Sequence, residues 1–136
     1  LLLGKLTKIT SRHYIECSKS IIFGDFSILA GIQSQIWTHG FIHAASGPDR
    51  YRVDGDIEIG NNVYIGSSCT FNPGIKICDA VTIGSNSSVS RSIKDPGLYV
   101  NQPLRRIEIN YNEGLKKYPK IKLPDEAGIV VYKKSV

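Results

Sequence analysis

Three histidines and three cysteines are the side chains of this 136-residue chain most capable of chemistry near neutral pH. An imidazole, with an ordinary pKa of about 6.5, can take up or release a proton there. His39 and His43 lie four residues apart, a spacing that binds a metal ion when both residues stand on one helix. Here they lie beside Gly40 in a polar stretch, with no cysteine or carboxylate at ligand spacing, so we expect no metal. His13 stands in no motif.

An apolar residue at every sixth position predicts the elements that must position these residues. This row consists of Val53, Ile59, Ile65, Phe71, Ile77, Ile83 and Val89. A second row follows four residues after each, namely Ile57, Val63, Cys69, Ile75, Val81, Ser87 and Ile93. A period of six fits neither a helix nor a free-standing strand. It is typical of a parallel β-helix, in which short strands joined by tight corners form the three sides of a prism. The sequence therefore predicts an all-β fold.

The same frame can be followed upstream, less regularly, through Cys17, Phe23 and Leu29, whereas residues 1–16 show strand-like alternation without a secure frame. Small residues follow the first apolar row at the corners. At three of these positions we expect that a Cβ atom would crowd the neighbouring coil, namely Gly60, Gly66 and Gly84.

The apolar pattern stops after Trp37 and resumes in phase at Val53. We therefore expect a loop extruded from the coil at residues 40–52, and such loops contain functional residues more often than the scaffold does. Residues 108–136 leave the repeat and include a strand-like run at 128–132. The predicted organisation is a β-helix domain at 1–107 and a C-terminal extension at 108–136.

The three cysteines are predicted to be structural. Cys69 lies on an inward row and Cys17 falls in the same frame, where a free cysteine behaves as a small hydrophobic residue. No two cysteines form a CxxC pair, which argues against a zinc ribbon, and Cys78 has no partner by spacing. We expect no disulfide and a cytoplasmic location.

Composition excludes several other classes. No run of eighteen apolar residues is present, so we expect no membrane span, and the first residues are too short for a signal peptide. The chain has no methionine, even at position 1, which is compatible with a preceding segment. The net charge of +5 includes a basic group in the tail, but we interpret it as a solvated surface and expect no nucleic acid.

The segment IEIGNNVYIGSSCTFNPGIKICDAVTIG, with YVNQPLRRI after it, resembles the hexapeptide-repeat acyltransferases. Within that family the chain is most similar to the galactoside, maltose and surface-polysaccharide O-acetyltransferases over residues 17–107. A Thr-His element at a coil edge, a loop containing arginine and an Ile-Gly-Asn-Asn-Val coil are specific to acetyl transfer. They stand here as Thr38-His39, the loop to Arg52, and Ile59–Val63. The family usually has proline where this chain has Gly40. The resemblance implies a left-handed coil, whereas general rules favour right-handed crossovers.

The resemblance implies an O-acetyltransferase that moves an acetyl group from acetyl-CoA to a hydroxyl of a sugar or polysaccharide precursor. His39 would be the general base for direct attack by the hydroxyl in a ternary complex. Arg52 and His43 would line the acceptor pocket, although solvent exposure of His43 is an equal alternative. Trp37 would either stack on a sugar face or pack at the coil edge.

Acetyl-CoA is the implied cosubstrate, and its phosphates require cations. The family has a Gly-x-Pro-Ala-Arg or Lys element after its last coil, which this chain matches at Pro103 and Arg105 but not at Asn101 and Leu104. The remaining residues expected at the cosubstrate are Tyr64, Ser67, Ser85, Arg91 and Arg106. For the serines the alternative is corner formation, and for Tyr64 it is interface packing.

Relatives of this shape are homotrimers with the sites between subunits, which would also compensate for the thin core of one short prism. We therefore expect a homotrimer. A γ-type carbonic anhydrase is excluded because it needs a third histidine in the repeat. The remaining alternative is a non-catalytic β-helix scaffold or binding subunit.

Overall fold

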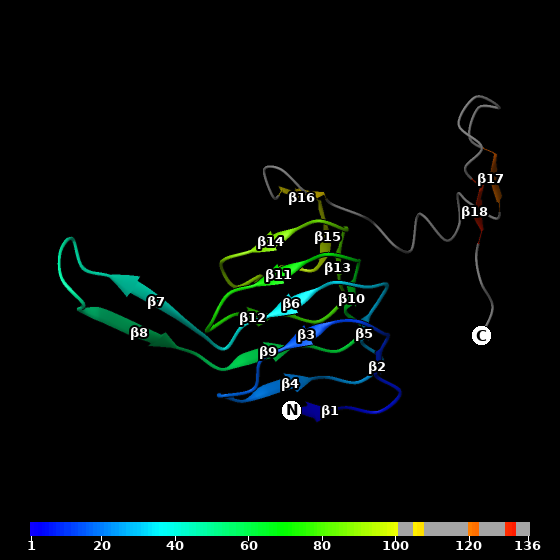
Figure 1. Ribbon diagram of the computed structural model, residues 1–136. Helices are drawn as coiled ribbons and strands as arrows, with labels where there is room; N and C mark the ends of the chain where they lie inside the picture. The colour runs from blue at the N-terminus through cyan, green and yellow to red at the C-terminus, as the bar shows by residue number, and fades with distance from the viewer. Residues whose placement is uncertain (101–104, 108–119, 123–129, 133–136) are drawn as a thin grey trace.

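The six-residue repeat folds into a three-sided prism, in which each coil contributes one short strand to each side (Figure 1). The computed structural model describes residues 1–100, 105–107, 120–122 and 130–132. The first side is a parallel sheet of β1 (Leu2–Leu3), β4 (Ile21–Phe23), β9 (Ile57–Ile59) and β12 (Lys76–Ile77). The second contains β2 (Lys8–Ile9), β5 (Ile28–Leu29), β10 (Tyr64–Ile65), β13 (Val81–Ile83) and β15 (Gly97–Val100), with β16 (Arg105–Ile107) antiparallel at its edge. The third contains β3 (Tyr14–Ile15), β6 (Gln35–Ile36), β11 (Thr70–Phe71) and β14 (Ser88–Val89).

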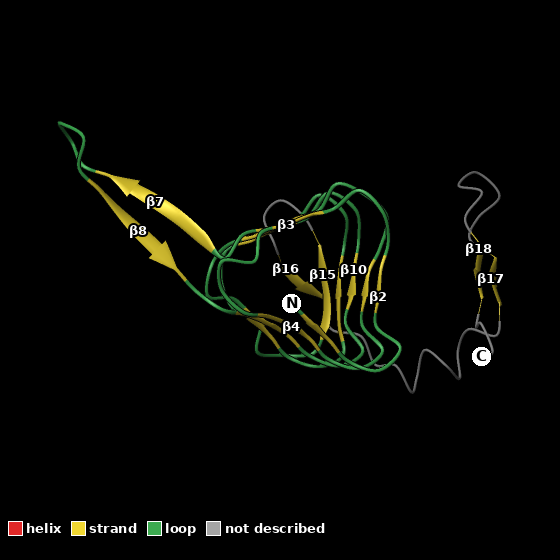
Figure 2. Ribbon diagram, turned by 60° about the horizontal axis from the view of Figure 1, so that its bottom comes forward, coloured by secondary structure: helices red, strands yellow, loops and turns green. Residues whose placement is uncertain are grey.

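The coil is left-handed. Seen from the N-terminal end, the chain turns counterclockwise as it recedes from the viewer (Figure 2). Over the residues described, the prism contains strands and turns and no helix, so none of that part could cross a membrane as a helix.

Both predicted apolar rows point into the prism between Ile57 and Ile93, where every member of either row is at most 5% exposed. Ile59 lies over Ile77, Ile65 over Ile83 and Phe71 over Val89, because consecutive coils pair residue for residue. Among the residues that the structure describes, seventeen apolar side chains form one core. The six-residue period thus predicted the inward positions correctly over the central coils.

The six-residue frame predicts inward side chains wrongly at two positions, Val53 and Cys17. Val53 is 42% exposed, because it pairs with Gly40 in a hairpin and the chain re-enters the prism only at Ile57. Cys17 is exposed as well, because Ile15 is the residue that packs against the core and Cys17 belongs to the corner after it. Residues 1–16, which had no secure frame, form a complete first coil of β1, β2 and β3.

The glycine prediction holds at two corners of three. A Cβ atom on Gly60 would lie 2.4 Å from Asp79 Oδ1, and one on Gly66 would lie 2.7 Å from the Ser85 nitrogen. On Gly84 the nearest atom would be 3.5 Å away, an ordinary contact. The corner above Gly84 is replaced by β15, so the close approach of two corners does not occur there.

The segment predicted as a loop at 40–52 is an antiparallel hairpin of β7 (His39–His43) and β8 (Arg50–Asp54). We call residues 39–54 the arm. The arm projects from one edge of the prism into the surroundings (Figures 1 and 2). Beyond the prism, β17 (Lys120–Lys122) pairs with β18 (Val130–Tyr132), which lies within the strand predicted at 128–132.

Candidate active site

Two departures from the repeat meet at one edge of the prism. In the first apolar row Phe23 follows Ile15 after eight residues instead of six, so the corner at residues 16–20 is longer than a regular corner. The arm leaves the prism at the same edge one coil later, because β6, which precedes it, pairs with β3. The longer corner and the base of the arm therefore lie against each other.

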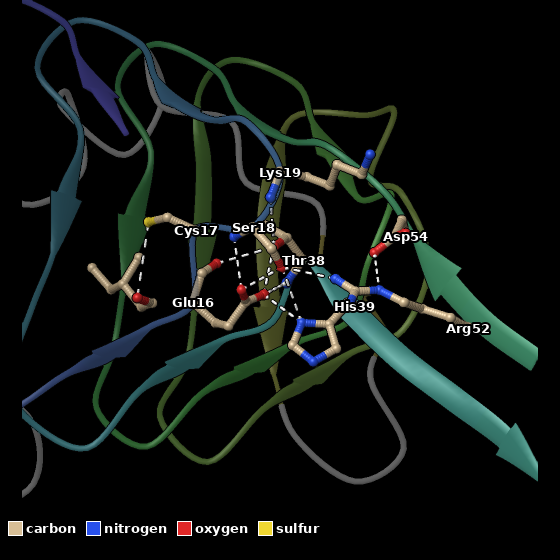
Figure 3. Close-up of polar contacts among 9 residues, drawn as sticks. Glu16, Cys17, Ser18, Lys19, Thr38, His39, Arg52 and Asp54 are labelled. Atoms are coloured by element: carbon tan, nitrogen blue, oxygen red, sulfur yellow. Dashed lines mark hydrogen bonds and ion pairs between the residues drawn. The ribbon is translucent and has the colours of Figure 1, made fainter.

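Their contact joins an imidazole to a carboxylate (Figure 3). His39 Nδ1 lies 2.9 Å from Glu16 Oε2 and 3.1 Å from Ser18 Oγ. The His39 side chain is 25% exposed and that of Glu16 is 14% exposed. If Nδ1–H donates to the carboxylate, Nε2 of the neutral ring is left as a proton acceptor. This is the arrangement required of a general base.

Thr38 fixes the carboxylate in place. Its side chain is completely buried, and its hydroxyl donates to Glu16 Oε2 over 2.5 Å and accepts from the Lys19 nitrogen over 3.1 Å. The Thr38 nitrogen donates to the same carboxylate oxygen over 3.1 Å. The threonine of the Thr-His element thus connects the base of the arm to the corner below it.

Ser18 completes the set of donors around Glu16. Its backbone nitrogen donates to Glu16 Oε1 over 2.7 Å, and its hydroxyl donates to the same oxygen. Hydrogen bonds from Ser18, then Thr38, and further His39 hold the pKa of the Glu16 carboxyl well below its usual range. Glu16 is therefore a carboxylate at every pH at which an enzyme of this kind would work.

Arg52 ties the outgoing strand of the arm to this cluster. Its Nε donates to Asp54 Oδ1 over 2.9 Å, and its Nη2 donates to Ser18 Oγ over 3.3 Å (Figure 3). The predicted acceptor-binding residue Arg52 therefore lies beside His39 in this chain.

An aromatic stripe crosses the site. Trp37 packs on Tyr14 with 4.7 Å between ring centroids and stands edge-on to His39 at 6.4 Å. On the other side of His39, Phe41 is edge-on at 5.9 Å. Trp37 Nε1 donates to Gln35 Oε1 over 3.1 Å, so Trp37 packs at the coil edge as one of its two predicted roles requires. The half-exposed stripe still offers rings beside the base.

The other two histidines differ. His43 lies at the outer end of β7, exposed, and pairs with Arg50 across the hairpin. His13 accepts from the Ser34 nitrogen at Nδ1 over 3.1 Å and lies 3.0 Å from Thr10 Oγ1 at Nε2. Partial burial lowers the pKa of His13. With both ring nitrogens occupied, His13 has a structural role.

The residues predicted to bind the cosubstrate lie away from the His39 edge of this chain. Tyr64 is 47% exposed on the outer surface of the second sheet. Ser67 and Ser85 stack at the next corner, where the Ser67 nitrogen donates to Ser85 Oγ over 3.2 Å. One chain therefore does not bring these residues to its own His39.

Cationic side chains gather at the last coil. Arg91, Lys94 and Arg106 line a cavity of about 340 Å³ together with Asp95 and Tyr99. The Tyr99 hydroxyl donates to the Asp95 carbonyl over 2.8 Å, and Arg106 Nε donates to the Pro96 carbonyl over 2.9 Å. Guanidinium groups are common partners of phosphates, so the cationic lining of this cavity suits an anionic group.

Two further predicted residues are not located by side-chain geometry. Pro103 lies outside the described residues, and Arg105 is described only as the first residue of β16. A larger cavity of about 570 Å³ runs along β4, β9 and β12, with the exposed Glu58–Lys76 pair on its wall, and contains none of the predicted site residues. Within the part of the chain that is described, no three His, Cys, Asp or Glu side chains form a metal-binding group.

Glu16 and Ser18 were missed by the sequence reasoning. Neither belongs to a motif, and Cys17 between them was assigned to an inward row. The useful signal is the break in the six-residue frame at residues 16–20, at the same edge as the break that contains His39.

The fold and this edge are similar to those of hexapeptide-repeat acyltransferases. Residues 56–91 match the family model described as bacterial transferase hexapeptide (six repeats). The predicted resemblance and the predicted left-handed parallel β-helix are thereby confirmed.

Particular relatives are acetyltransferases. The chain is 35% identical over 69 residues to a chloramphenicol acetyltransferase of Morganella morganii, covering 51% of this chain and 33% of that protein. It is 46% identical over 55 residues to the galactoside O-acetyltransferase of Escherichia coli K12, covering 40% and 27%. A solved galactoside acetyltransferase in complex with coenzyme A superposes with a TM-score of 0.72 at 25% identity, over 98% of this chain and 62% of that chain. The chain spans about a third of the length of the curated relatives it matches.

Proposed function

We propose that this protein is an acetyl-CoA-dependent O-acetyltransferase whose acceptor is a hydroxyl of a sugar or polysaccharide precursor. The observation that carries the proposal is the contact of His39 Nδ1 with Glu16 Oε2 at the base of the arm. A carboxylate on Nδ1 orients the ring, selects the tautomer with a free Nε2 and stabilises the imidazolium that forms on proton uptake.

The reaction needs a base because a neutral alcohol is a weak nucleophile. His39 Nε2 takes the hydroxyl proton as the alcohol oxygen attacks the thioester carbonyl, and the released CoA sulfur receives a proton. A covalent cysteine intermediate is not required. Cys69 is buried and donates to the Gly84 carbonyl over 3.3 Å, and burial raises the pKa of the Cys69 thiol.

The acceptor is proposed to be a sugar because of the aromatic stripe and the relatives. Tyr14, Trp37 and Phe41 place rings on both sides of His39, and aromatic faces suit the apolar faces of sugar rings. The similarity to a galactoside O-acetyltransferase supports the same class.

The active site is proposed to form between subunits of a homotrimer. His39 lies at one edge of the prism, whereas Tyr64, Ser67 and Ser85 lie on another side and corner of the same chain. A neighbouring copy would present those residues to His39. The free cysteines suit a cytoplasmic location.

The test is the variant His39→Ala. Turnover of acetyl-CoA should fall by about 10²- to 10⁴-fold, while CoA affinity and thermal stability stay close to those of the wild type. His43→Ala removes an imidazole from the same side of the arm and should change chiefly the acceptor KM. Retention of more than a tenth of the turnover by His39→Ala would reject His39 as the general base. Failure of the wild-type protein to bind CoA would favour the scaffold alternative.

A further inference from the structure

The arm has two chemically different sides. Its register pairs His39 with Asp54, Phe41 with Arg52 and His43 with Arg50, so these six residues share one side. The opposite side has Gly40 with Val53 and Ile42 with Tyr51, of which the last two are at least 60% exposed. We call the first the polar side. It is continuous with the site, because Arg52 reaches Ser18 and the Phe41 ring touches the His39 ring.

The polar side has an available cation at its outer part. The Arg50 guanidinium carbon lies 5.0 Å from the centroid of the Phe41 ring, and Arg50 forms no ion pair with any residue that the structure describes. Arg52, in contrast, is engaged by Asp54. Among the six residues of the polar side, Asp54 is the one carboxylate. Asp49 lies farther out, where its carbonyl accepts from the Ala44 nitrogen, and the alternation of the strand places its side chain on the opposite side.

The spacing places this cation farther out along the arm than His39. A strand advances about 3.4 Å per residue, so Phe41 stands about 7 Å along the arm from His39. The Arg50 guanidinium covers that ring, and the exposed His43 imidazole lies farther out. An acceptor that has its hydroxyl at His39 Nε2 and extends outward along the arm would lie over Phe41 and bring its next unit to Arg50.

We infer that the acceptor is anionic, with a phosphate or carboxylate on the unit next to the acetylated sugar. This inference rests on the proposed function and assigns Arg50, assisted by His43, as the residue that determines this specificity. An arginine placed over an aromatic ring still has N–H groups available for a charge-assisted contact with such a group. A neutral acceptor would leave this cation without a partner.

The experiment uses two matched pairs of acceptors and the full chain. Methyl galactoside is compared with galactose 1-phosphate, and lactose is compared with its analogue in which the glucose unit is oxidised to glucuronate. Acetyl transfer gives kcat/KM for each, and NMR titration without acetyl-CoA gives the affinity of each. The charged member of at least one pair should be preferred about five- to tenfold, as expected for one partly exposed charge-assisted contact. The pair that shows the preference distinguishes phosphate from carboxylate.

Three variants locate the effect. Arg50→Gln should abolish the preference, lowering kcat/KM for the charged acceptor about five- to tenfold and that for the neutral acceptor less than twofold. Arg50→Lys should retain most of the preference, since it keeps the charge. Lys5→Gln removes an exposed cation at a different edge of the prism, between β1 and β2, and should leave the preference unchanged.

Equal binding of charged and neutral members, absence of binding by either charged probe, or a preference that persists in Arg50→Gln would overturn the inference. A charge preference in binding without acetyl transfer would instead reject the proposed function and keep the anion site.

Discussion

Replacing Glu16 by glutamine tests whether the carboxylate acts through His39. Oε2 of Glu16 accepts from the Thr38 nitrogen and hydroxyl and faces His39 Nδ1, while Oε1 accepts twice from Ser18. A glutamine has one acceptor oxygen. With that oxygen in the Oε2 position it keeps the contact with His39, but its NH₂ group then faces the Ser18 N–H. Glu16→Gln should therefore fold, hold the imidazole and lack the negative charge that stabilises the imidazolium.

The magnitude follows from the exposure of the pair. Changing the aspartate of a buried Asp-His pair to asparagine lowers kcat by about 10⁴-fold, because the imidazole is then held in the wrong tautomer, which a glutamine oxygen facing Nδ1 would avoid here. Here the two side chains are 25% and 14% exposed, so water partly replaces the lost interaction. We expect kcat of Glu16→Gln to fall about ten- to hundredfold, and that of Glu16→Ala to fall further, because Ala also leaves Nδ1 and the Thr38 nitrogen unpaired.

The assay is steady-state acetyl transfer at saturating acetyl-CoA, with thermal unfolding as the measure of folding. The KM for acetyl-CoA should stay within twofold, because Glu16 lies at the His39 edge and not at the cationic cavity. Glu58→Gln is the matched control, since Glu58 forms an exposed pair with Lys76 on another side. If Glu16→Gln kept more than half of the wild-type kcat, the carboxylate would have no role in proton transfer. A loss of kcat equal to the loss of folded protein would make its role structural.

Three other outcomes can be measured. Arg105→Ala and Arg91→Ala should each raise the KM for acetyl-CoA about tenfold. The KM for acetyl-pantetheine should stay unchanged, because this compound has no nucleotide phosphates. Equal effects on both KM values would show that these arginines do not bind the phosphates. Light scattering should give three times the 15.0 kDa mass of the chain, and a folded monomer at micromolar concentration would contradict the trimer. The stability that the Glu16 carboxylate contributes should be present above its ordinary pKa of about 4.3 and be lost as the pH falls towards its lowered folded-state pKa. The free energies of unfolding in urea of the wild type and Glu16→Gln should therefore converge below about pH 4. A difference that is constant with pH would show that Glu16 has no lowered pKa.

The inward residues of the central coils could be predicted because they depend on local order only. Each six-residue side presents its apolar residues to the axis regardless of the other coils, so Ile59, Ile65 and Phe71 follow from the period. The prediction was wrong at Val53 and Cys17, where inserted residues shift the frame and no local signal shows which residue returns to the core.

The identity of His39 as the candidate base also came from the sequence, through the Thr-His element and the family resemblance. The position of the extruded segment was predicted as well, although its hairpin structure was not. The Tyr64, Ser67, Ser85 and arginine assignments remain predictions.

The partner of His39 was decided by the tertiary structure. Glu16 and His39 are separated by a complete coil of the chain, and they meet only because β3 and β6 stack in register and the longer corner below lies under the arm. The two sides of the arm likewise depend on the pairing of β7 with β8, since a shift by one residue would place Arg50 and Arg52 on the side opposite His39. Sequence order specifies which residues lie in a side of the prism, whereas the stacking of coils and the register of the hairpin determine which of them touch.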